Sequence, residues 1–134
     1  MAYLLDTSTC VFFLRGQLNL DQKLKEKGRE NFYVSEITIL ELYYGAENSD
    51  KPDKSYRAVA DFLSGLKIIP IYSSMKRYAK EKVRLRRIGK PMNDEFDLLI
   101  GVSAVENRLK LVTDNVNDFR DLEGLEIENW FQRN

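Results

Sequence analysis

Four acidic residues stand where folding could bring them together. Asp6 follows an apolar run, Glu41 lies inside a strongly apolar segment, and Asp97 begins another one. Asp118 follows a polar turn, so the stretch 93–119 carries acids at both ends. A carboxylate in apolar company is costly to bury unless it is paired, protonated or bound to a metal. These positions therefore predict a site that uses carboxylates for chemistry.

The absence of certain residue types excludes several kinds of catalytic site. The chain has no histidine and one cysteine, Cys10. His-based triads, the usual zinc sites and an internal disulfide are therefore excluded. Cys10 lies in the apolar run CVFFL, and we interpret it as a small core residue rather than a nucleophile. Any hydrolytic chemistry must use carboxylates, hydroxyls or a metal bound through oxygen, and oxygen ligands suit Mg²⁺ or Mn²⁺.

The composition is that of an ordinary globular protein. Hydrophobic residues make up 43% and charged residues 31% of the 134 positions, which fits one domain over 1–134. No apolar run approaches the roughly 18 residues of a membrane span. The N-terminus carries an acid where a signal peptide would be apolar, so we expect a cytoplasmic protein that does not associate with a membrane. Basic and acidic residues number 21 each, but a neutral total does not exclude nucleic-acid binding.

Apolar runs alternate with amphipathic segments along the whole chain. Strands are predicted at 2–5, 31–35, 67–71 and 110–113, with a fifth edge strand within 124–130. Helices are predicted at 7–16, 19–28, 36–49, 53–66, 73–89 and 94–107, with a turn or short helix at 113–119. This alternation predicts an α/β fold of three layers, in which helices cover both faces of a mainly parallel sheet of four to five strands.

Such a fold places most of the acids at one rim of the sheet. Asp6 and the Asp114–Asp118 cluster follow strands, so they lie at carboxyl ends, where open α/β sheets bind ligands. Asp94 and Asp97 begin a helix, which usually lies on the same rim. Glu41 is two turns into its helix and must lean over the rim. Simpler interpretations stay open here, since Asp6 could only cap a helix and Glu41 could be a partly exposed structural residue.

Basic residues gather near the end of the helix predicted at 73–89. They could form a solvated helix end, where cations also suit the helix dipole. They could equally contact phosphates beside the acidic rim. The candidates for this second role are Lys80, Arg84, Arg86 and Arg87.

Several segments together resemble a known family. They are YLLDTSTC, SEITILELYYGAE, NDEFDLLIGVSA and LVTDNVNDF, followed by GLEIENW, and they cover essentially the whole chain in order. The sequence resembles the PIN-domain ribonucleases, and it is most similar to the VapC-type toxins of bacterial toxin–antitoxin pairs. The resemblance implies a PIN-like fold and hydrolysis of RNA, but it leaves open whether transfer, ribosomal or messenger RNA is cleaved.

The resemblance also implies a role for each acid. Asp6, Glu41 and Asp97 match the three central acids of the family, and Asp118 matches the fourth. We expect Asp6 and Asp97 to be the principal ligands of Mg²⁺, with Mn²⁺ as an alternative. Glu41 would bind the ion directly or orient the attacking water as a base. Asp118 would hold a second ion or its water shell, so one or two metals remain open.

Neighbouring polar residues match supporting positions of the family. They are Thr7, Asp94, Thr113, Asp114 and Asn115. Ser8 stands where most members carry asparagine, which puts one supporting contact in doubt but not the metal site.

The resemblance further implies protein partners. A small antitoxin would lay its C-terminal segment across the groove and insert a basic side chain among the acids, and the toxin would form a homodimer. Tyr43 and Tyr44 are candidates for a partner surface because both cannot easily face inward, although core packing explains most of the aromatic content equally well.

Two other functions compete with this one. A Mg²⁺-dependent phosphatase would use Asp6 as its nucleophile, but such enzymes favour an Asp-x-Asp pair, whereas Thr7 and Ser8 follow here. A non-catalytic module could instead dock a basic peptide in an acidic pocket. The complete set of acids argues against this module without excluding it.

Overall fold

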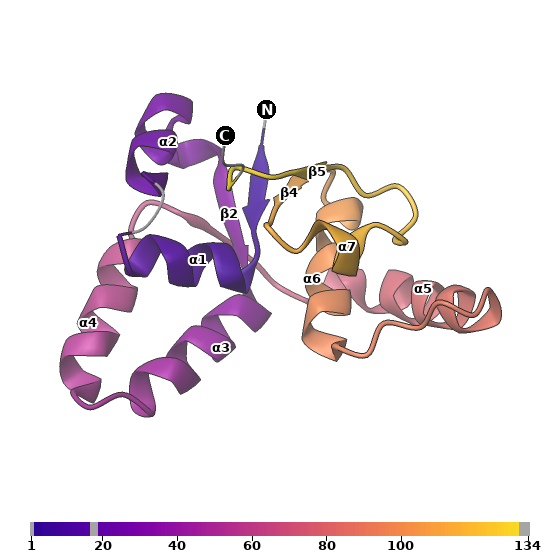
Figure 1. Ribbon diagram of the computed structural model, residues 1–134, viewed down its shortest axis with the longest axis horizontal. Helices are drawn as coiled ribbons and strands as arrows, with labels where there is room; N and C mark the ends of the chain where they lie inside the picture. Colours follow the sequence, from indigo (N-terminus) through magenta and orange to yellow (C-terminus); the bar gives the residue numbers. More distant parts are fainter. Residues whose placement is uncertain (1, 17–18, 132–134) are drawn as a thin grey trace.

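The computed structural model describes residues 2–16 and 19–131 and contains one five-stranded sheet (Figure 1). Its strands are β1 (Tyr3–Leu5), β2 (Phe32–Ser35), β3 (Lys67–Ile69), β4 (Lys110–Val112) and β5 (Ile127–Glu128). They lie in the order β3-β2-β1-β4-β5, and every neighbouring pair is parallel. The predicted α/β class and parallel sheet are confirmed.

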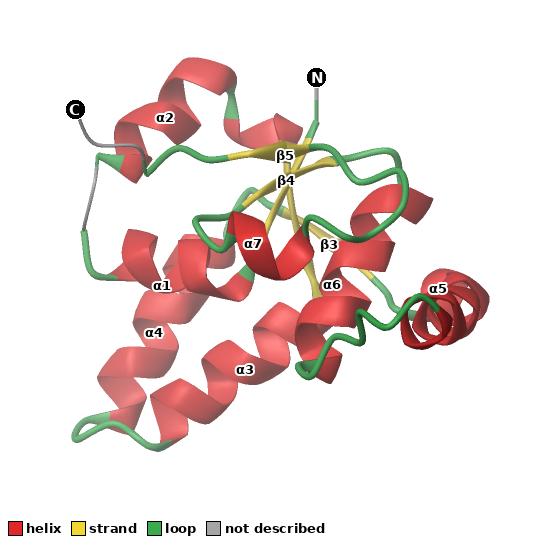
Figure 2. Ribbon diagram, turned by 45° about the vertical axis from the view of Figure 1, so that its right-hand side comes forward, coloured by secondary structure: helices red, strands yellow, loops and turns green. Residues whose placement is uncertain are grey.

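Helices cover both faces of this sheet (Figure 1, Figure 2). On one side lie α1 (Thr7–Leu14), α2 (Leu20–Lys27), α3 (Glu36–Glu47) and α4 (Pro52–Leu63). On the other lie α5 (Met75–Arg87), α6 (Glu95–Glu106) and the short α7 (Val116–Phe119). No helix in the described ranges is long and apolar enough to cross a membrane.

The central strand β1 is apolar throughout because both of its faces are buried. Leu4 packs into the core under α5 and α6, whereas Tyr3 and Leu5 pack into the core under α1 to α4. Successive side chains of a strand point to opposite faces, so a strand covered on both sides reads as a continuous apolar run. Cys10 is fully buried in the second of these cores, as predicted, and burial raises the pKa of its thiol.

The strand order places a crevice between β1 and β4. The chain runs outward from β1 through β2 to β3, then crosses to β4 on the opposite side of β1. Ligands bind outside the carboxyl ends of strands at the point where such an order reverses. Asp6 and Thr113 are the first residues after these two strands, and the Asp6 N–H donates to the Val112 carbonyl at 3.2 Å. The reversal point therefore lies at Asp6.

The two edge strands are shorter than predicted. The predicted strand 67–71 ends at Ile69, directly before Pro70, which lacks the N–H needed to continue the ladder. The predicted strand within 124–130 is reduced to Ile127–Glu128, the two residues that pair with β4.

Close packing of α6 against the segment after α7 depends on Gly101. A Cβ atom here would collide with Leu122 and lie 3.3 Å from Phe119. Gly101 is thus required for this close packing. This contact brings α7 against α6, and thus Asp118 toward Asp97.

Candidate active site

Asp6 is a buried carboxylate that also caps a helix. Its side chain, only 1% exposed, is the N-cap of α1 and accepts the Thr9 N–H at 2.9 Å. The Ser8 hydroxyl lies 3.1 Å from each carboxylate oxygen. Burial raises the pKa of this carboxyl, and hydrogen bonds from Thr113, Thr9 and Ser8 act against that rise. The capping interpretation is correct, but capping leaves the cost of burying the charge uncompensated.

Glu41 reaches the crevice with the help of two threonines. The Thr7 hydroxyl on α1 donates to Glu41 Oε1 at 2.7 Å, and the buried Thr38 hydroxyl lies 3.0 Å from Thr7 Oγ1. A hydroxyl has one proton, so Thr38 must donate to Thr7 while Thr7 donates to Glu41. Burial raises the pKa of Glu41, the Thr7 hydrogen bond opposes this, and the charges of Asp94 and Asp6 add to it.

Asp97 shows that the acids lie near one another. It sits in the first turn of α6, where Asp94 caps the helix and accepts the Asp97 N–H at 3.1 Å. The pKa of Asp97 rises from 3.8 to about 7, mainly because of burial. Nearby negative charges add to this rise, and in descending order they are Asp94, Asp6, Glu41 and Asp118. Residues from four separate elements thus act on one carboxyl group.

The turn after β4 supports Asp6 from the other side of the crevice. Thr113 is fully buried, and its hydroxyl accepts the Asn115 N–H at 2.9 Å. Asp114 Oδ1 lies 3.2 Å from Ser8 Oγ, so this hydroxyl bridges Asp114 and Asp6. Ser8, which departs from the usual asparagine, therefore still supplies a polar contact between the two strand ends.

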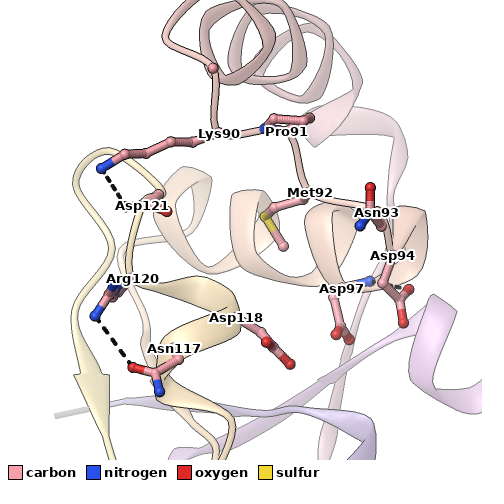
Figure 3. A pocket seen from close by; sticks show the side chains of 11 residues that line it. Lys90, Pro91, Met92, Asn93, Asp94, Asp97, Asn117, Asp118, Arg120 and Asp121 are labelled. Carbon is pink, nitrogen blue, oxygen red and sulfur yellow. Dashed lines mark hydrogen bonds and ion pairs between the residues drawn. The ribbon is translucent and has the colours of Figure 1, made fainter.

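A pocket of about 540 Å³ opens beside these acids. Figure 3 shows the carboxylates of Asp94, Asp97 and Asp118 directed toward a common space. Asp118 is exposed, but the next residue, Phe119, is fully buried and anchors α7. The pocket is lined by Gly89, Lys90, Pro91, Met92, Asn93, Asp94, Asp97, Asn117, Asp118, Arg120 and Asp121.

The donor chemistry of this site fits a hard divalent cation. None of the ion pairs within residues 2–16 and 19–131 includes Asp6, Glu41 or Asp97. In the same ranges, no three His, Cys, Asp or Glu side chains form a ready-made metal cluster. Mg²⁺ does not require one, since it commonly takes one or two carboxylates and completes its shell with water and substrate phosphates. Unpaired carboxylates with raised pKa values are suitable ligands.

Known proteins place this arrangement in a family. A PIN domain model matches residues 3–125. The chain is 31% identical to the tRNA(fMet)-specific endonuclease VapC of Salmonella typhimurium and 32% identical to Ribonuclease VapC2 of Haemophilus influenzae. Each match covers 97% of this chain and 98% of the relative. The chain belongs to the VapC-type ribonuclease toxins of the PIN-domain family.

Solved VapC-type structures share its fold. The DNA-bound VapBC of Salmonella typhimurium superposes with a TM-score of 0.89 at 28% identity, covering 97% of this chain and 98% of that one. VapBC2 of Rickettsia felis, bound to a promoter DNA fragment, superposes with a TM-score of 0.88 at 29% identity. This match covers 97% of this chain and 99% of that one. Family membership favours the ribonuclease over the phosphatase alternative.

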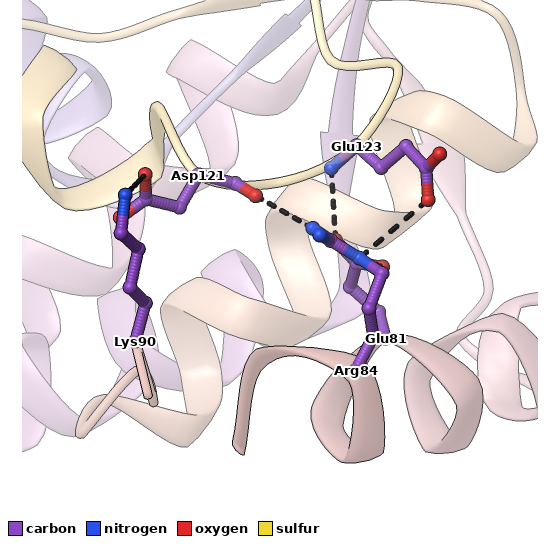
Figure 4. Close-up of polar contacts among 5 residues, drawn as sticks. All are labelled: Glu81, Arg84, Lys90, Asp121 and Glu123. Atoms are coloured by element: carbon purple, nitrogen blue, oxygen red, sulfur yellow. Dashed lines mark hydrogen bonds and ion pairs between the residues drawn. The ribbon is translucent and has the colours of Figure 1, made fainter. Parts of the chain in front are cut away.

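The basic residues proposed for this VapC-type chain divide into two kinds. Lys80, Arg86 and Arg87 are exposed on α5. Arg84 instead donates to Glu81 through Nε at 2.8 Å and Nη2 at 2.6 Å (Figure 4). It also pairs with Glu123 at 3.5 Å. Arg84 therefore has a structural role, which competes with the predicted contact to RNA.

Two contributors to the VapC-type site were missed from the sequence. Thr38 stands three residues before Glu41 on the same helix, a spacing that could have indicated it. Thr9 donates its hydroxyl to the Val112 carbonyl at 2.9 Å and its N–H to Asp6. The structural Glu81 was also missed. Its i,i+3 spacing to Arg84 is a local signal, but its contact with the N–H of Glu123, 42 residues away, is not.

Proposed function

We propose that the chain is a Mg²⁺-dependent endoribonuclease that hydrolyses phosphodiester bonds of transfer RNA. The observation that carries this proposal is the gathering of four other acids near the half-buried Asp97, whose pKa is raised to about 7 by burial and by their charges. Acids gathered in this way without a cationic partner need a bound cation to be fully ionised. The choice of transfer RNA follows two relatives, the tRNA(fMet)-specific endonucleases VapC of Salmonella typhimurium and Shigella flexneri.

Each acid has a defined task in this proposal. Asp6 and Asp97 would hold the ion, Mg²⁺ or Mn²⁺, and Asp118 would stand at the open side. A bound ion of this kind polarises a phosphoryl oxygen and lowers the pKa of an attacking water. Glu41, held by the Thr7 hydroxyl at 2.7 Å, would accept the proton of that water.

The test is cleavage of a transfer RNA pool, with Mg²⁺, with Mn²⁺ and with EDTA. The wild-type chain should cut with either metal and not with EDTA. Asp97→Asn should abolish cutting and weaken Mg²⁺ binding measured by calorimetry. Asp53→Asn, at an exposed acid in the first turn of α4, is the matched control and should behave like wild type. Cleavage in EDTA, or full activity and unchanged Mg²⁺ affinity in Asp97→Asn, would overturn the proposal.

We also propose that a small antitoxin protein blocks this site and that the toxin is a homodimer in the cytoplasm. Solved relatives include a toxin–antitoxin complex of Klebsiella pneumoniae, at 26% identity and a TM-score of 0.71. The partner would place a basic side chain among the unpaired acids. Leu40, Tyr43 and Tyr44 on α3 are 53%, 47% and 72% exposed, which supports a partner surface there.

These partner proposals have separate readouts. Light scattering of the toxin alone should give twice the mass of a monomer. The substitution Tyr44→Asp should reduce this measured mass. Co-expression with the neighbouring short reading frame should yield a complex that no longer cuts RNA. A docking module would bind that partner equally well but would leave RNA intact with every metal, and that result would sink the nuclease proposal.

A further inference from the structure

The pocket beside the acids has a basic end as well as an acidic end. Lys90 and Arg120 line the same pocket of about 540 Å³ as Asp97 and Asp118. Figure 3 shows Lys90 and Arg120 on one side of this space, with their charged ends turned toward Asp121 and Asn117, and Asp97 on the other side, with Asp118 pointing toward it. The exposed cations of α5, by contrast, do not line this pocket. Residues of opposite charge therefore line the two ends of one cavity.

The partners of these two cations hold them only weakly. Lys90 Nζ lies 3.6 Å from Asp121 Oδ1, and the Lys90 side chain is 59% exposed. An exposed pair of this kind contributes little to stability, so a phosphate could replace Asp121 at small cost. Arg120 Nη1 donates to Asn117 Oδ1 at 3.4 Å, a long hydrogen bond that uses one of its five donors. Both side chains retain donors for a phosphate.

The backbone that carries these cations is firmly held (Figure 4). Arg84 Nη2 donates to the Asp121 carbonyl at 2.7 Å, and Glu81 Oε2 accepts the Glu123 N–H at 2.8 Å. The Lys90 N–H donates to the Leu85 carbonyl at 2.9 Å, which fixes the turn after α5. Thus α5 and the segment 120–123 form one corner. A site held in place before binding loses less entropy when the ligand arrives.

We propose that Lys90 and Arg120 form a phosphate-binding subsite for the RNA backbone next to the cleaved bond. This inference rests on the proposed function, because it names how the same pocket holds its substrate. The acids at the other end of the pocket repel every phosphate that no cation screens, so a bound strand needs compensating positive charge here. Lys90 and Arg120 are placed to supply it, whereas Lys80 lies on α5 outside the pocket.

The test compares Lys90→Gln, Arg120→Gln and the double variant with Lys54→Gln, a matched loss of one exposed cation on α4. Transfer RNA cleavage is followed over a salt range of about 50–200 mM. Each pocket variant should raise KM about 3- to 10-fold, leave kcat within about twofold, and lower the salt slope of kcat/KM by about one. Asp121→Asn should lower KM, because it releases Lys90 and leaves the backbone carbonyl bonded to Arg84 intact. Lys54→Gln should match wild type.

Equal KM values and salt slopes for Lys54→Gln and the two pocket variants would overturn the subsite while leaving the nuclease proposal intact. If wild type cleaves no RNA, the nuclease proposal fails on its own. Binding of fluorescent transfer RNA, measured by anisotropy with the same variants, then still decides the subsite. A loss of affinity for a protein partner without a loss for RNA would assign the two cations to that partner and overturn the inference. Thermal melting confirms that each variant is folded.

Discussion

Carboxylates in two parts of this molecule behave in opposite ways. Asp6 is 1% exposed and Glu81 is 8% exposed, whereas Asp97 is half-buried. Burial raises the pKa of Asp6 and of Asp97. The pKa of Glu81 is lowered, first by its hydrogen bond with Arg84 and also by the Glu123 N–H, although burial acts in the opposite direction. The partners of Glu81 thus outweigh the effect of its burial, whereas burial prevails at Asp6 and Asp97.

This contrast separates structural acids from acids that serve a ligand. Glu81 has a guanidinium and a backbone donor, so its charge is compensated within the fold. Asp6 and Asp97 have hydrogen-bond donors, but no ion pair with Lys or Arg in the described residues. Carboxylates kept in this state lower the stability of the free protein and gain a partner only when a cation binds. Perturbed pKa values of this kind are typical of functional sites.

The largest expected effect comes from Asp97→Asn. Loss of this ligand should reduce kcat/KM for RNA about 1000-fold, since it removes several kcal/mol of transition-state stabilisation. The same change should raise the free energy of unfolding of the metal-free protein by about 1 kcal/mol, because an uncompensated charge is removed. RNA cleavage and urea unfolding in EDTA measure the two effects.

Activity should fall and stability should rise in Asp97→Asn, and these opposite signs identify the role of the residue. A variant that merely unfolds would lose activity and stability together. If Asp97→Asn proved less stable than wild type in EDTA, Asp97 would be compensated like Glu81, and the contrast between the two sets would fail.

A smaller effect is expected from Thr7→Val, which keeps the size of the side chain but removes the donor to Glu41. Loss of a residue that orients a ligand in this way typically lowers metal affinity or activity about 10- to 100-fold. Calorimetric titration with Mg²⁺ and the rate of RNA cleavage would show the loss. Thr9→Val, which removes a hydroxyl bonded to Val112 and leaves the N–H to Asp6, is the matched variant. An unaltered rate in Thr7→Val would remove Glu41 from the proposed chemistry.

Glu81→Ala addresses the structural side of the comparison. Removal of this carboxylate leaves Arg84 and the Glu123 N–H without their partner, which should cost about 1–3 kcal/mol of unfolding free energy. Urea unfolding measures the cost. The control is Glu95→Ala, which breaks the exposed Lys82–Glu95 pair and should cost less than about 1 kcal/mol. Equal losses of unfolding free energy in the two variants would show that the enclosed position of Glu81 does not add to stability.

Much of the fold could be predicted because its signals are local. A strand covered on both faces must be apolar at every position, so Tyr3–Leu5 was visible as a run. The edge strands were overestimated for two reasons. Pro70 ends β3 from within the edge segment itself. The length of β5 depends on its pairing with β4, and that information does not lie in the edge segment.

The candidate site was only partly predictable. Asp6 and Asp97 directly flank apolar elements, so topology alone placed them at one rim. The role of Arg84 could not be foreseen, because every cation of a basic run looks alike until tertiary packing turns one of them toward residues 121–123. Thr38 was predictable only in part, since its spacing from Glu41 is local but its hydroxyl matters only when α1 and α3 meet.

The pH dependence of stability gives the finest test of the contrast. Asp97 has a raised pKa, so its contribution is fully present below 3.8 and is lost as pH rises through about 7. Glu81 has a lowered pKa, so its contribution is present above 4.5 and is lost as pH falls through its lower folded value. Metal-free wild type should therefore lose about 1 kcal/mol, after allowance for solvent screening, between about pH 5 and about pH 8.

Melting temperatures in EDTA would show this as a fall of about 3–6 °C across that range. The chain has no histidine, so few other side chains titrate there. Asp97→Asn should flatten the curve, and saturating Mg²⁺ should reduce or reverse the slope because the ionised carboxylate then has a partner. Glu81→Ala should keep the slope near neutral pH and weaken only the loss of stability on the acid side. A wild-type slope that survives Asp97→Asn unchanged would mean that Asp97 is already compensated within the fold, as Glu81 is.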